Sequence, residues 1–554
     1  MNRRSRLRLA VAALASAVAL STVAVSTAAG ADTLPSPAPL LQRTPDLVTG
    51  APLPTIQLDS GYVWAQTTIG TTVYAGGSFS NAREAGKAAG AGALSARSNL
   101  LAYDITTGAL LPFAPQVNGV IKSIAASPDG KRIYIGGSFS SVNGQPRYNI
   151  AALDAATGAL VPGFSASIGG TGVYTLTATD TTVYAGGLFT QASGAPRKNL
   201  AAFSTAGSLL AWAPTTDLQV DASVMDPTKQ KVIVGGRFAT VNGAAQRGLA
   251  ALDPATGAIL PWAVPASVQN GVSTGSYAGK AGIFSLTADA NAVYGTGWVR
   301  YSQAGNLEGT FAAEAGTGNV RWIADCHGDH YGVYSTGKVV YTTSHVHACE
   351  SMGQFPGSTN TYKYAEAYTT DVRGILGRPQ DVGVYKDWSG TPSPAAYNWY
   401  PDFTVGTATG LGQAGLSVTG TGDYISIGGE FGTANNKQFQ GLVRFATAPT
   451  GEKAPPRLST GWSGTVTSQL DTVKVSIPAN WDRDDKVLSY DLYREGVTTP
   501  VATTTAESTW WSRPTVSLQV SGLTPGSTQR FRVVARDADG NSATSDWMTK
   551  VVGG

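Results

Sequence analysis

The sequence predicts an all-β protein in which a ring of small repeated sheets precedes a second β domain. A glycine-pair motif recurs along most of the chain, and each copy sits in a unit of four short strands. The last hundred or so residues instead alternate apolar and polar side chains without the repeat. Units of four strands that return about every 50 residues are typical of propeller blades. We therefore expect a seven-bladed β-propeller followed by a β-sandwich.

The repeated motif is clearest at residues 73–79, which read Val-Tyr-Ala-Gly-Gly-Ser-Phe. An apolar strand precedes each copy, and another strand, a tight turn and a short aromatic strand follow it. Glycine pairs suit strand positions where two backbones approach closely. The further copies, some of them weaker, lie at residues 133–139, 183–189, 233–238, 293–298, 340–345 and 425–431.

The two ends of the repeat region complement each other. The last unit stops after its third strand, near Phe445, whereas residues 53–57 align with the fourth strand of the first unit at 111–115. We expect this N-terminal strand to complete the last blade, which would remove the open sheet edges. The propeller is then predicted to span residues 50–446.

A linker at 447–456 is followed by a domain at 457–554. Its turns at 523–526 and 537–541 resemble those of fibronectin type III domains. The resemblance implies a β-sandwich, although Gln529 stands where that family usually has its corner tyrosine. The tryptophan expected in an early strand is also displaced, to Trp481.

The propeller units resemble the Gly-Gly-x-Phe repeats of secreted actinobacterial propellers, the delta-60-type family. They are also similar to the outer propeller of fungal bud-site proteins. This resemblance covers most of residues 60–446. It implies a fold and a surface location but no reaction.

The N-terminus is typical of an export signal at residues 1–31, followed by a short linker at 32–49. A basic start precedes an apolar run and a small-residue cleavage site. Removing its four arginines changes the formal net charge from +3 to about −1. We therefore expect a secreted monomer, extracellular or associated with the cell wall. No nucleic-acid partner and no membrane span after cleavage are expected.

All four histidines and both cysteines fall between Cys326 and Glu350. Two cysteines in an exported chain predict a Cys326–Cys349 disulfide, with two free thiols as the alternative. The segment between them is predicted to form a hairpin with strands at 330–335 and 339–347.

Two registers of this hairpin are open, because cross-strand partners keep a constant index sum. One register places Cys326, His330, His345, His347 and Cys349 on one face. The other opposes Asp329 to His345 and His327 to His347. Either one gathers at least three potential metal ligands.

A metal site is one hypothesis for this cluster, since three imidazoles with an open position suit Zn²⁺ and imidazole also binds copper. Its ligands would come from His327, His330, His345 and His347. The alternative is a hydrogen-bonded network that orders a loop. The catalytic residue is unassigned, with Asp329, His330 and Glu350 as candidates for acid, base or ligand-orienting roles.

Aromatic residues in units that depart from the repeat could stack on sugar rings: Trp298, Tyr301, Tyr362 and Trp399. A long insertion at about 353–394 is expected to shape a ligand site. The leading functional hypothesis is a binding or scaffold protein that holds a polysaccharide or an extracellular or cell-wall protein on its loop face. The alternative is a secreted hydrolase, glycosidic or metal-dependent, centred on the hairpin and acting in polysaccharide degradation. A purely architectural role is the third option.

Overall fold

The computed structural model describes residues 34–87, 90–381, 385–449 and 454–553. The predicted export signal lies outside these residues. The described chain is almost entirely β structure, with one short helix, α1 (Val264–Ser267), and two 3-10 turns, η1 (Glu350–Met352) and η2 (Gly357–Thr359). None of its helices is long and apolar enough to cross a membrane.

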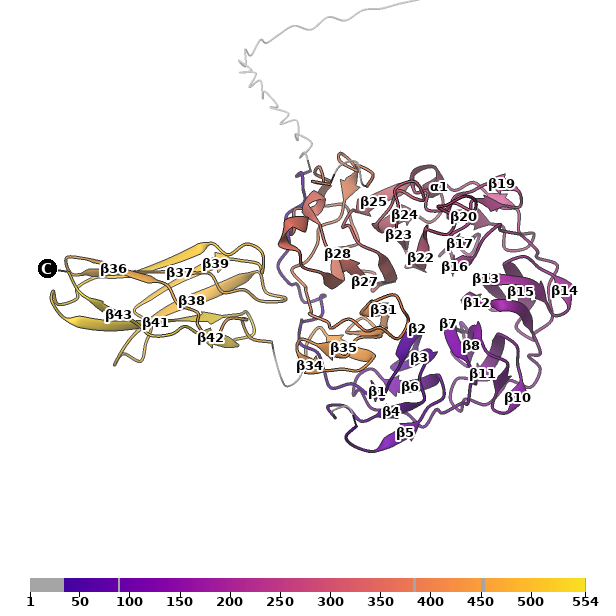
Figure 1. Cartoon of the computed structure of the whole chain (residues 1–554), viewed down its shortest axis with the longest axis horizontal. Helices are drawn as coiled ribbons and strands as arrows, with labels where there is room; N and C mark the ends of the chain where they lie inside the picture. Colours follow the sequence, from indigo (N-terminus) through magenta and orange to yellow (C-terminus); the bar gives the residue numbers. More distant parts are fainter. Residues whose placement is uncertain (1–33, 88–89, 382–384, 450–453, 554) are drawn as a thin grey trace, which may run out of the picture. The chain divides into compact units, whose positions relative to one another are not determined.

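Small antiparallel sheets follow one another along the chain up to Ala446 (Figure 1). Each innermost strand packs against the innermost strand of the next sheet, and β31 packs back against β2. The sheets therefore close into a ring, and the propeller prediction is confirmed. From inside outward they are β2 (Tyr62–Ile69), β3 (Thr72–Ser78) and β6 (Leu100–Asp104); β7 (Val120–Ala126), β8 (Arg132–Ser138) and β11 (Ile150–Asp154); β12 (Ile168–Ala178), β13 (Thr182–Ala192) and β15 (Leu200–Ser204); β16 (Val220–Met225), β17 (Val232–Gly236), β20 (Leu249–Leu252) and β21 (Ile259–Leu260); β22 (Ala281–Ala288), β23 (Ala292–Val299), β24 (Gly309–Glu314) and β25 (Val320–Ala324); β26 (His330–Ser335), β27 (Val339–Val346) and β28 (Lys363–Thr369); and β31 (Gly415–Gly420), β32 (Tyr424–Gly429) and β35 (Leu442–Ala446).

Short strands decorate the ring edges and loops. They are β1 (Gln57–Leu58), β4 (Asn81–Arg83), β5 (Leu94–Ala96), β9 (Ser141–Val142), β10 (Gln145–Pro146), β14 (Ala195–Pro196), β18 (Thr240–Val241), β19 (Ala244–Ala245), β29 (Gly374–Ile375), β30 (Pro392–Ser393), β33 (Thr433–Ala434) and β34 (Lys437–Gln438).

The N-terminal segment lies along the outer edge of the last sheet. Leu53 forms an antiparallel bridge with Arg444 of β35, and the Thr49 amide donates to the Ala446 carbonyl at 2.9 Å. In the second sheet, the equivalent outer place is taken by Leu160, which bridges to Leu153. Residues 49–53 thus take the outer position that, in the second sheet, is taken by the chain segment directly after its third strand.

The glycine pair of the repeat is required by the packing of neighbouring sheets. A Cβ on Gly76 would lie 2.6 Å from Cγ2 of Ile121 in the next sheet, and one on Gly136 would lie 2.5 Å from Cγ1 of Val173. The second glycine, for example Gly137, faces the backbone of the innermost strand in its own sheet. In the sheets that carry the pair, a branched side chain of the next sheet occupies the space that a Cβ on the first glycine would need.

The recurrent aromatic residues of the outer strands form the cores of the sheets. Trp212 packs edge to face on Tyr184 at 5.1 Å, and Trp399 packs on Tyr341 at 5.5 Å. Trp399 is 0% exposed. The hypothesis that Trp399 binds a ligand is therefore wrong, because its ring is buried in the core and offers no face to a ligand.

The C-terminal part contains two antiparallel sheets around a separate apolar core. Trp462, Tyr490 and Leu492 are among its buried residues. One sheet comprises β36 (Thr465–Gln469), β37 (Thr472–Pro478) and β40 (Thr515–Val520). The other comprises β38 (Val487–Arg494), β39 (Ala502–Glu507), β41 (Thr528–Arg536), β42 (Ser542–Thr544) and β43 (Met548–Val551).

Candidate functional site

The hairpin of the sixth sheet has the predicted strands, but its register changes along its length. His330 pairs with Ser344, whereas His327 bridges to Ala348, so both predicted index sums occur in succession. Gly328 lies between them with a φ of 133°, a conformation that favours glycine. The prediction that His330 shares one face with His345 and His347 is therefore wrong.

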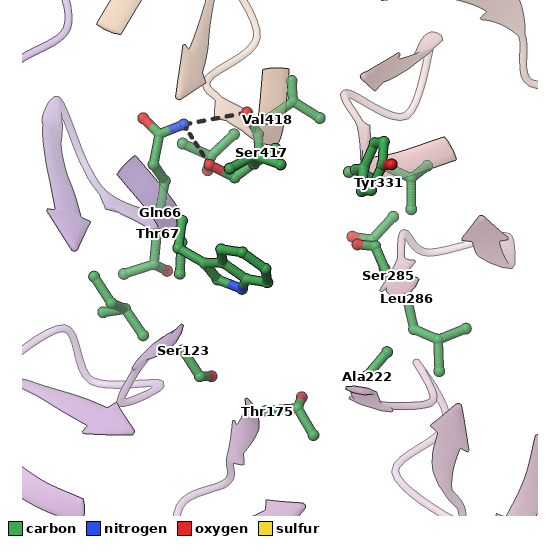
Figure 2. A pocket seen from close by; sticks show the side chains of 18 of the residues that line it. Gln66, Thr67, Ser123, Thr175, Ala222, Ser285, Leu286, Tyr331, Ser417 and Val418 are labelled. Carbon is green, nitrogen blue, oxygen red and sulfur yellow. Dashed lines mark hydrogen bonds between the residues drawn. The ribbon is translucent and has the colours of Figure 1, made fainter. Parts of the chain in front are cut away.

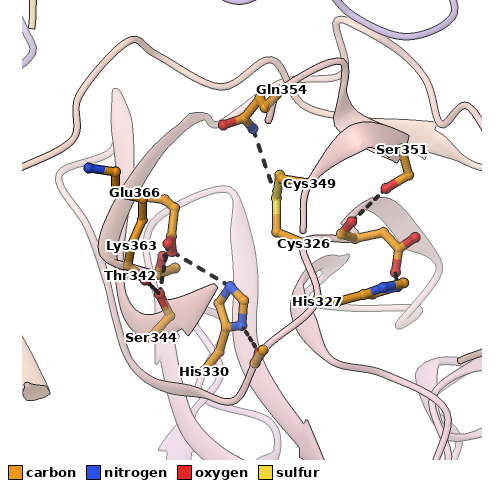
Figure 3. The surroundings of a disulfide bond; sticks show 12 residues. Cys326, His327, His330, Thr342, Ser344, Cys349, Ser351, Gln354, Lys363 and Glu366 are labelled. Atoms are coloured by element: carbon orange, nitrogen blue, oxygen red, sulfur yellow. Dashed lines mark hydrogen bonds and ion pairs between the residues drawn. A yellow bond between two sulfur atoms is a disulfide. The ribbon is translucent and has the colours of Figure 1, made fainter. Parts of the chain in front are cut away.

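Cys326 and Cys349 form the predicted disulfide (Figure 3). Both residues are buried, and the Gln354 amide lies 3.8 Å from the sulfur of Cys326. The bond ties together the two ends of the hairpin. It also removes both thiolates from any set of metal ligands.

His330 is buried in a polar network with Glu366 and does not reach the solvent (Figure 3). It is 0% exposed, and its Nδ1 donates to the Gly328 carbonyl at 2.8 Å. Its Nε2 is 3.6 Å from Glu366, which also accepts hydrogen bonds of 2.7 Å from Thr342 and Ser344. Burial lowers the pKa of His330 to about 3 and raises the pKa of Glu366 to about 7. The candidate acid, base or metal ligand His330 is thus a neutral structural residue.

His345 and His347 reach the solvent side of the hairpin with Tyr362. The two imidazoles are stacked with centroids 6.4 Å apart, and Tyr362 lies edge-on to each at 6.1 Å. Nδ1 of His345 is 2.6 Å from the Gln413 amide. Burial, followed by the neighbouring histidines, lowers the pKa of His347 to about 4, so its ring is neutral near pH 7.

His327 is a buried ion-pair residue. Its Nδ1 lies 2.9 Å from Asp381 and its Nε2 lies 3.4 Å from Asp325, while its ring stacks on Tyr385 at 4.2 Å. Burial opposes the charge on His327, but the two carboxylates outweigh it and raise the pKa to about 10. His327 is therefore an imidazolium over the physiological range.

Two carboxyl groups adjoin these histidines. Glu308 is buried and accepts a 2.9 Å hydrogen bond from the Gly328 amide. Burial and the nearby Asp329 raise the pKa of Glu308 to about 8. Burial also raises the pKa of Asp329, and Tyr331 donates to that carboxylate at 3.1 Å. We call Glu308, His327, Asp329, His345, His347 and Tyr362 the histidine site.

The four histidines do not converge on a point. Across the described ranges, the cluster of three or more potential ligands within 4.8 Å of one another consists of Asp482, Asp484 and Asp485 in the C-terminal part. It includes no histidine. The geometry at the hairpin instead separates a sealed His330, an ion-paired His327 and the half-buried rings of His345 and His347.

The other predicted site residues differ in their exposure and in their contacts. Tyr362 is 49% exposed and belongs to the histidine site, whereas Tyr301 is 44% exposed and packs on Tyr277. Trp298 is half-buried and contacts Phe284 and the guanidinium of Arg237. Glu350 accepts from the Gln380 amide at 3.3 Å.

Glu308 of the histidine site, and several residues that contact the site, carried no signal in the sequence. Glu308 precedes β24 in the fifth sheet, and Gln413 precedes the last sheet. Asp381 and Tyr385 come from the long insertion, which thereby contacts His327 as a ligand-shaping loop would. Sequence spacing could not have joined these residues, because three different sheets and a loop bring them together.

Comparison with known proteins supports the fold class. A family model described as "Domain of unknown function (DUF5122) beta-propeller" matches residues 127–160. No curated protein gives a significant match.

Two solved structures are similar at low identity. The Cps50 (Swd1) β-propeller domain of Myceliophteria thermophila is 10% identical, with a TM-score of 0.38, over 71% of this chain and 99% of that one. Dihydro-heme d1 dehydrogenase NirN in complex with DHE is 13% identical, with a TM-score of 0.32, over 87% of this chain and 81% of that one.

Proposed function

We propose that this chain is an exported protein that binds a polysaccharide on the propeller face that carries the histidine site. Seven innermost strands that contact one another in order support a seven-bladed propeller. The two C-terminal sheets, with the turns at 523–526 and 537–541, support a fibronectin type III module. The disulfide and the N-terminal leader support export.

The observation that carries this proposal is the set of neighbouring rings at the half-buried His345 and His347 and the exposed Tyr362. Tyr362 offers an apolar ring face with a polar hydroxyl tip, and neutral His347 offers both a donor and an acceptor. Such groups suit a sugar ring, which presents apolar faces and a rim of hydroxyl groups. His345 and His347 stand on a disulfide-bonded hairpin and Tyr362 directly precedes β28, which pairs with that hairpin, so little ordering is needed on binding.

A glycan array probed with the mature chain tests the proposal. We expect Tyr362→Ala and His347→Ala to weaken binding of the recognised glycan by at least about tenfold. Tyr148→Ala is the matched control, because Tyr148 is 54% exposed in another sheet. Binding of an extracellular protein and of no glycan would contradict the proposal.

A hydrolase is the second candidate, and the Glu308–Asp329 pair favours it. Burial raises the pKa of both carboxyl groups, and a carboxyl group that stays protonated near pH 7 suits the acid of glycoside hydrolysis. Glu308, protonated near pH 7, would be the acid and Asp329 the base or nucleophile. Release of reducing ends that Glu308→Gln abolishes would support this candidate. A metal-dependent version requires about one equivalent of Zn or Cu by elemental analysis of the mature protein.

A further inference from the structure

Each innermost strand of the ring has one interruption at an equivalent position, and β12 has two further register shifts before it. At that point the pairing with the second strand skips one residue, which is a β-bulge and re-aims that side chain. The skipped residues are Trp64 in β2, Lys122 in β7, Tyr174 in β12, Asp221 in β16, Phe284 in β22, Tyr331 in β26 and Leu416 in β31. We call this set the bulge collar.

All members of the bulge collar line one cavity of about 400 Å³ in the central channel. Beyond the collar the wall is rich in hydroxyl and amide groups, and Figure 2 shows Gln66, Ser285, Thr175 and Ser417 around it. A concave site of this size with aromatic walls and a few polar groups is typical of a small-ligand pocket.

The fold explains the bulges but not the residues in them. The second glycine of each pair lies against the bulged backbone, as Gly187 does against Gly172 and Val173. The residues just before the bulge are uniformly branched and apolar in five strands, at positions 63, 121, 173, 220 and 283. The bulged residues themselves are aromatic, basic, acidic or aliphatic. Packing between strands therefore determines where the bulge occurs. It does not determine which side chain stands at the bulge, so that side chain can be one that binds a ligand.

Aromatic rings of the collar form a wall across the channel. Trp64 and Phe284 have centroids 6.2 Å apart, although β2 and β22 are not neighbouring strands. Phe284 also contacts Tyr331 edge to face at 4.7 Å. The wall is apolar on its faces, as stacking on a sugar ring requires.

The lining of the cavity holds one ammonium group, that of Lys122, and one carboxylate, that of Asp221. Asp221 is paired with Arg237 at 3.0 Å. The ammonium of Lys122 lies 4.2 Å from the Tyr174 ring centroid and 5.0 Å from that of Trp64. No carboxylate of the described residues lies within 4.0 Å of it. Asp221 forms its salt bridge with Arg237 and attracts Lys122 only from beyond 4.0 Å, so the Lys122 ammonium has room for an anionic ligand.

We infer that the bulge collar binds a carboxylate-bearing sugar unit, with the carboxylate on the Lys122 ammonium and the ring on the wall of Trp64 and Phe284, which the buried Tyr331 supports from behind. This inference rests on the proposed polysaccharide-binding function and names the class of sugar. Charge-assisted hydrogen bonds to a carboxylate are roughly twice as strong as neutral ones, and a partly desolvated ammonium gains most from such a partner.

Calorimetric titration of the mature chain with oligogalacturonate, oligomannuronate and hyaluronan hexasaccharide tests the inference, with cellohexaose as the neutral probe. We expect one acidic probe to bind at least about tenfold more tightly than cellohexaose, with a preference that falls in high salt. Lys122→Gln should remove that preference, and Lys122→Arg should retain it. Lys198→Gln is the control, because it removes the same charge from an exposed site.

The outcomes separate the two proposals. Acidic-sugar binding that survives Lys122→Gln and Trp64→Ala but is lost in Tyr362→Ala would overturn the collar and leave the histidine site standing. Preferential binding of cellohexaose would also overturn it. Absence of binding by every probe, together with an empty glycan array, would overturn both. Unchanged thermal unfolding of Lys122→Arg and Lys122→Gln shows that the comparison is between folded proteins.

Discussion

The phenol of Tyr331 donates a hydrogen bond of 3.1 Å to Oδ2 of Asp329. Tyr331 belongs to the bulge collar, and Asp329 belongs to the histidine site. The Tyr331 ring also lies 6.5 Å from that of His345. The buried Tyr331 therefore connects the lining of the channel cavity to the histidine site.

The disulfide should stabilise the hairpin. Cys326 and Cys349 are 23 residues apart, and closing a loop of that length in the unfolded chain contributes about 3 kcal/mol. We expect the Cys326→Ser, Cys349→Ser double variant to unfold at a lower urea concentration than the oxidised protein. Reductant should lower the midpoint of the wild type and leave the variant unchanged; equal midpoints for the two oxidised proteins would contradict this.

The charge on His327 should make stability fall as pH rises. Its pKa in the folded chain, about 10, exceeds the ordinary value of 6.5. Its contribution is therefore complete below pH 6.5 and is lost between pH 6.5 and 10. Urea midpoints measured across that window should decline in the wild type and less so in His327→Gln. Parallel declines in the two proteins would show that another group is responsible.

Glu308→Gln tests the buried carboxyl group. Because the folded pKa of Glu308 is raised from 4.5 to about 8, its stabilising contribution is present below pH 4.5 and lost as pH rises to 8. Glutamine mimics the protonated form, so the variant should gain stability relative to wild type at pH 9 compared with pH 4. Glu314→Gln, at an exposed turn, should show no such crossover. Thermal unfolding at the two pH values provides the measurement.

Gly136→Ala should destabilise the ring. The added Cβ would meet Val173 of the next sheet at 2.5 Å, and overpacking of this kind costs about 1–3 kcal/mol. Gly163→Ala is the matched control, because nothing lies within 4 Å of its Cβ position. Combining Gly136→Ala with Val173→Ala should remove the clash, so the double variant should lose less stability than the sum of the two single variants, as measured by chemical denaturation. An unaltered midpoint in Gly136→Ala would contradict the proposed role of the motif.

Deleting the chain before residue 58 should loosen the ring. It would remove the Leu53–Arg444 bridge and the Thr49–Ala446 hydrogen bond, and it would expose the edge of β35. We expect a lower unfolding temperature and faster proteolysis near residues 442–446. The mature chain, which begins after residue 31, is the reference, and equal unfolding temperatures for the two proteins would contradict the prediction.

The histidine site could be located from the sequence but not assembled from it. Clustering of histidine and cysteine between 326 and 350 identified the hairpin and its disulfide. It could not show that Gly328 shifts the register, which turns His330 into a sealed partner of Glu366. Nor could it supply Glu308, Asp381 or Tyr385, which are distant in the chain and carry no local pattern.

By itself, the sequence determined the repeating strands, the glycine pairs, the ring and the cysteine pair, because local periodicity and composition encode those features. Only the tertiary structure decided which side chains face the channel and which carboxyl groups become neutral. A bulge moves a side chain without altering the repeat, and burial shifts a pKa through neighbours from other sheets. Those effects arise when the sheets close into a ring, so no segment contains them alone.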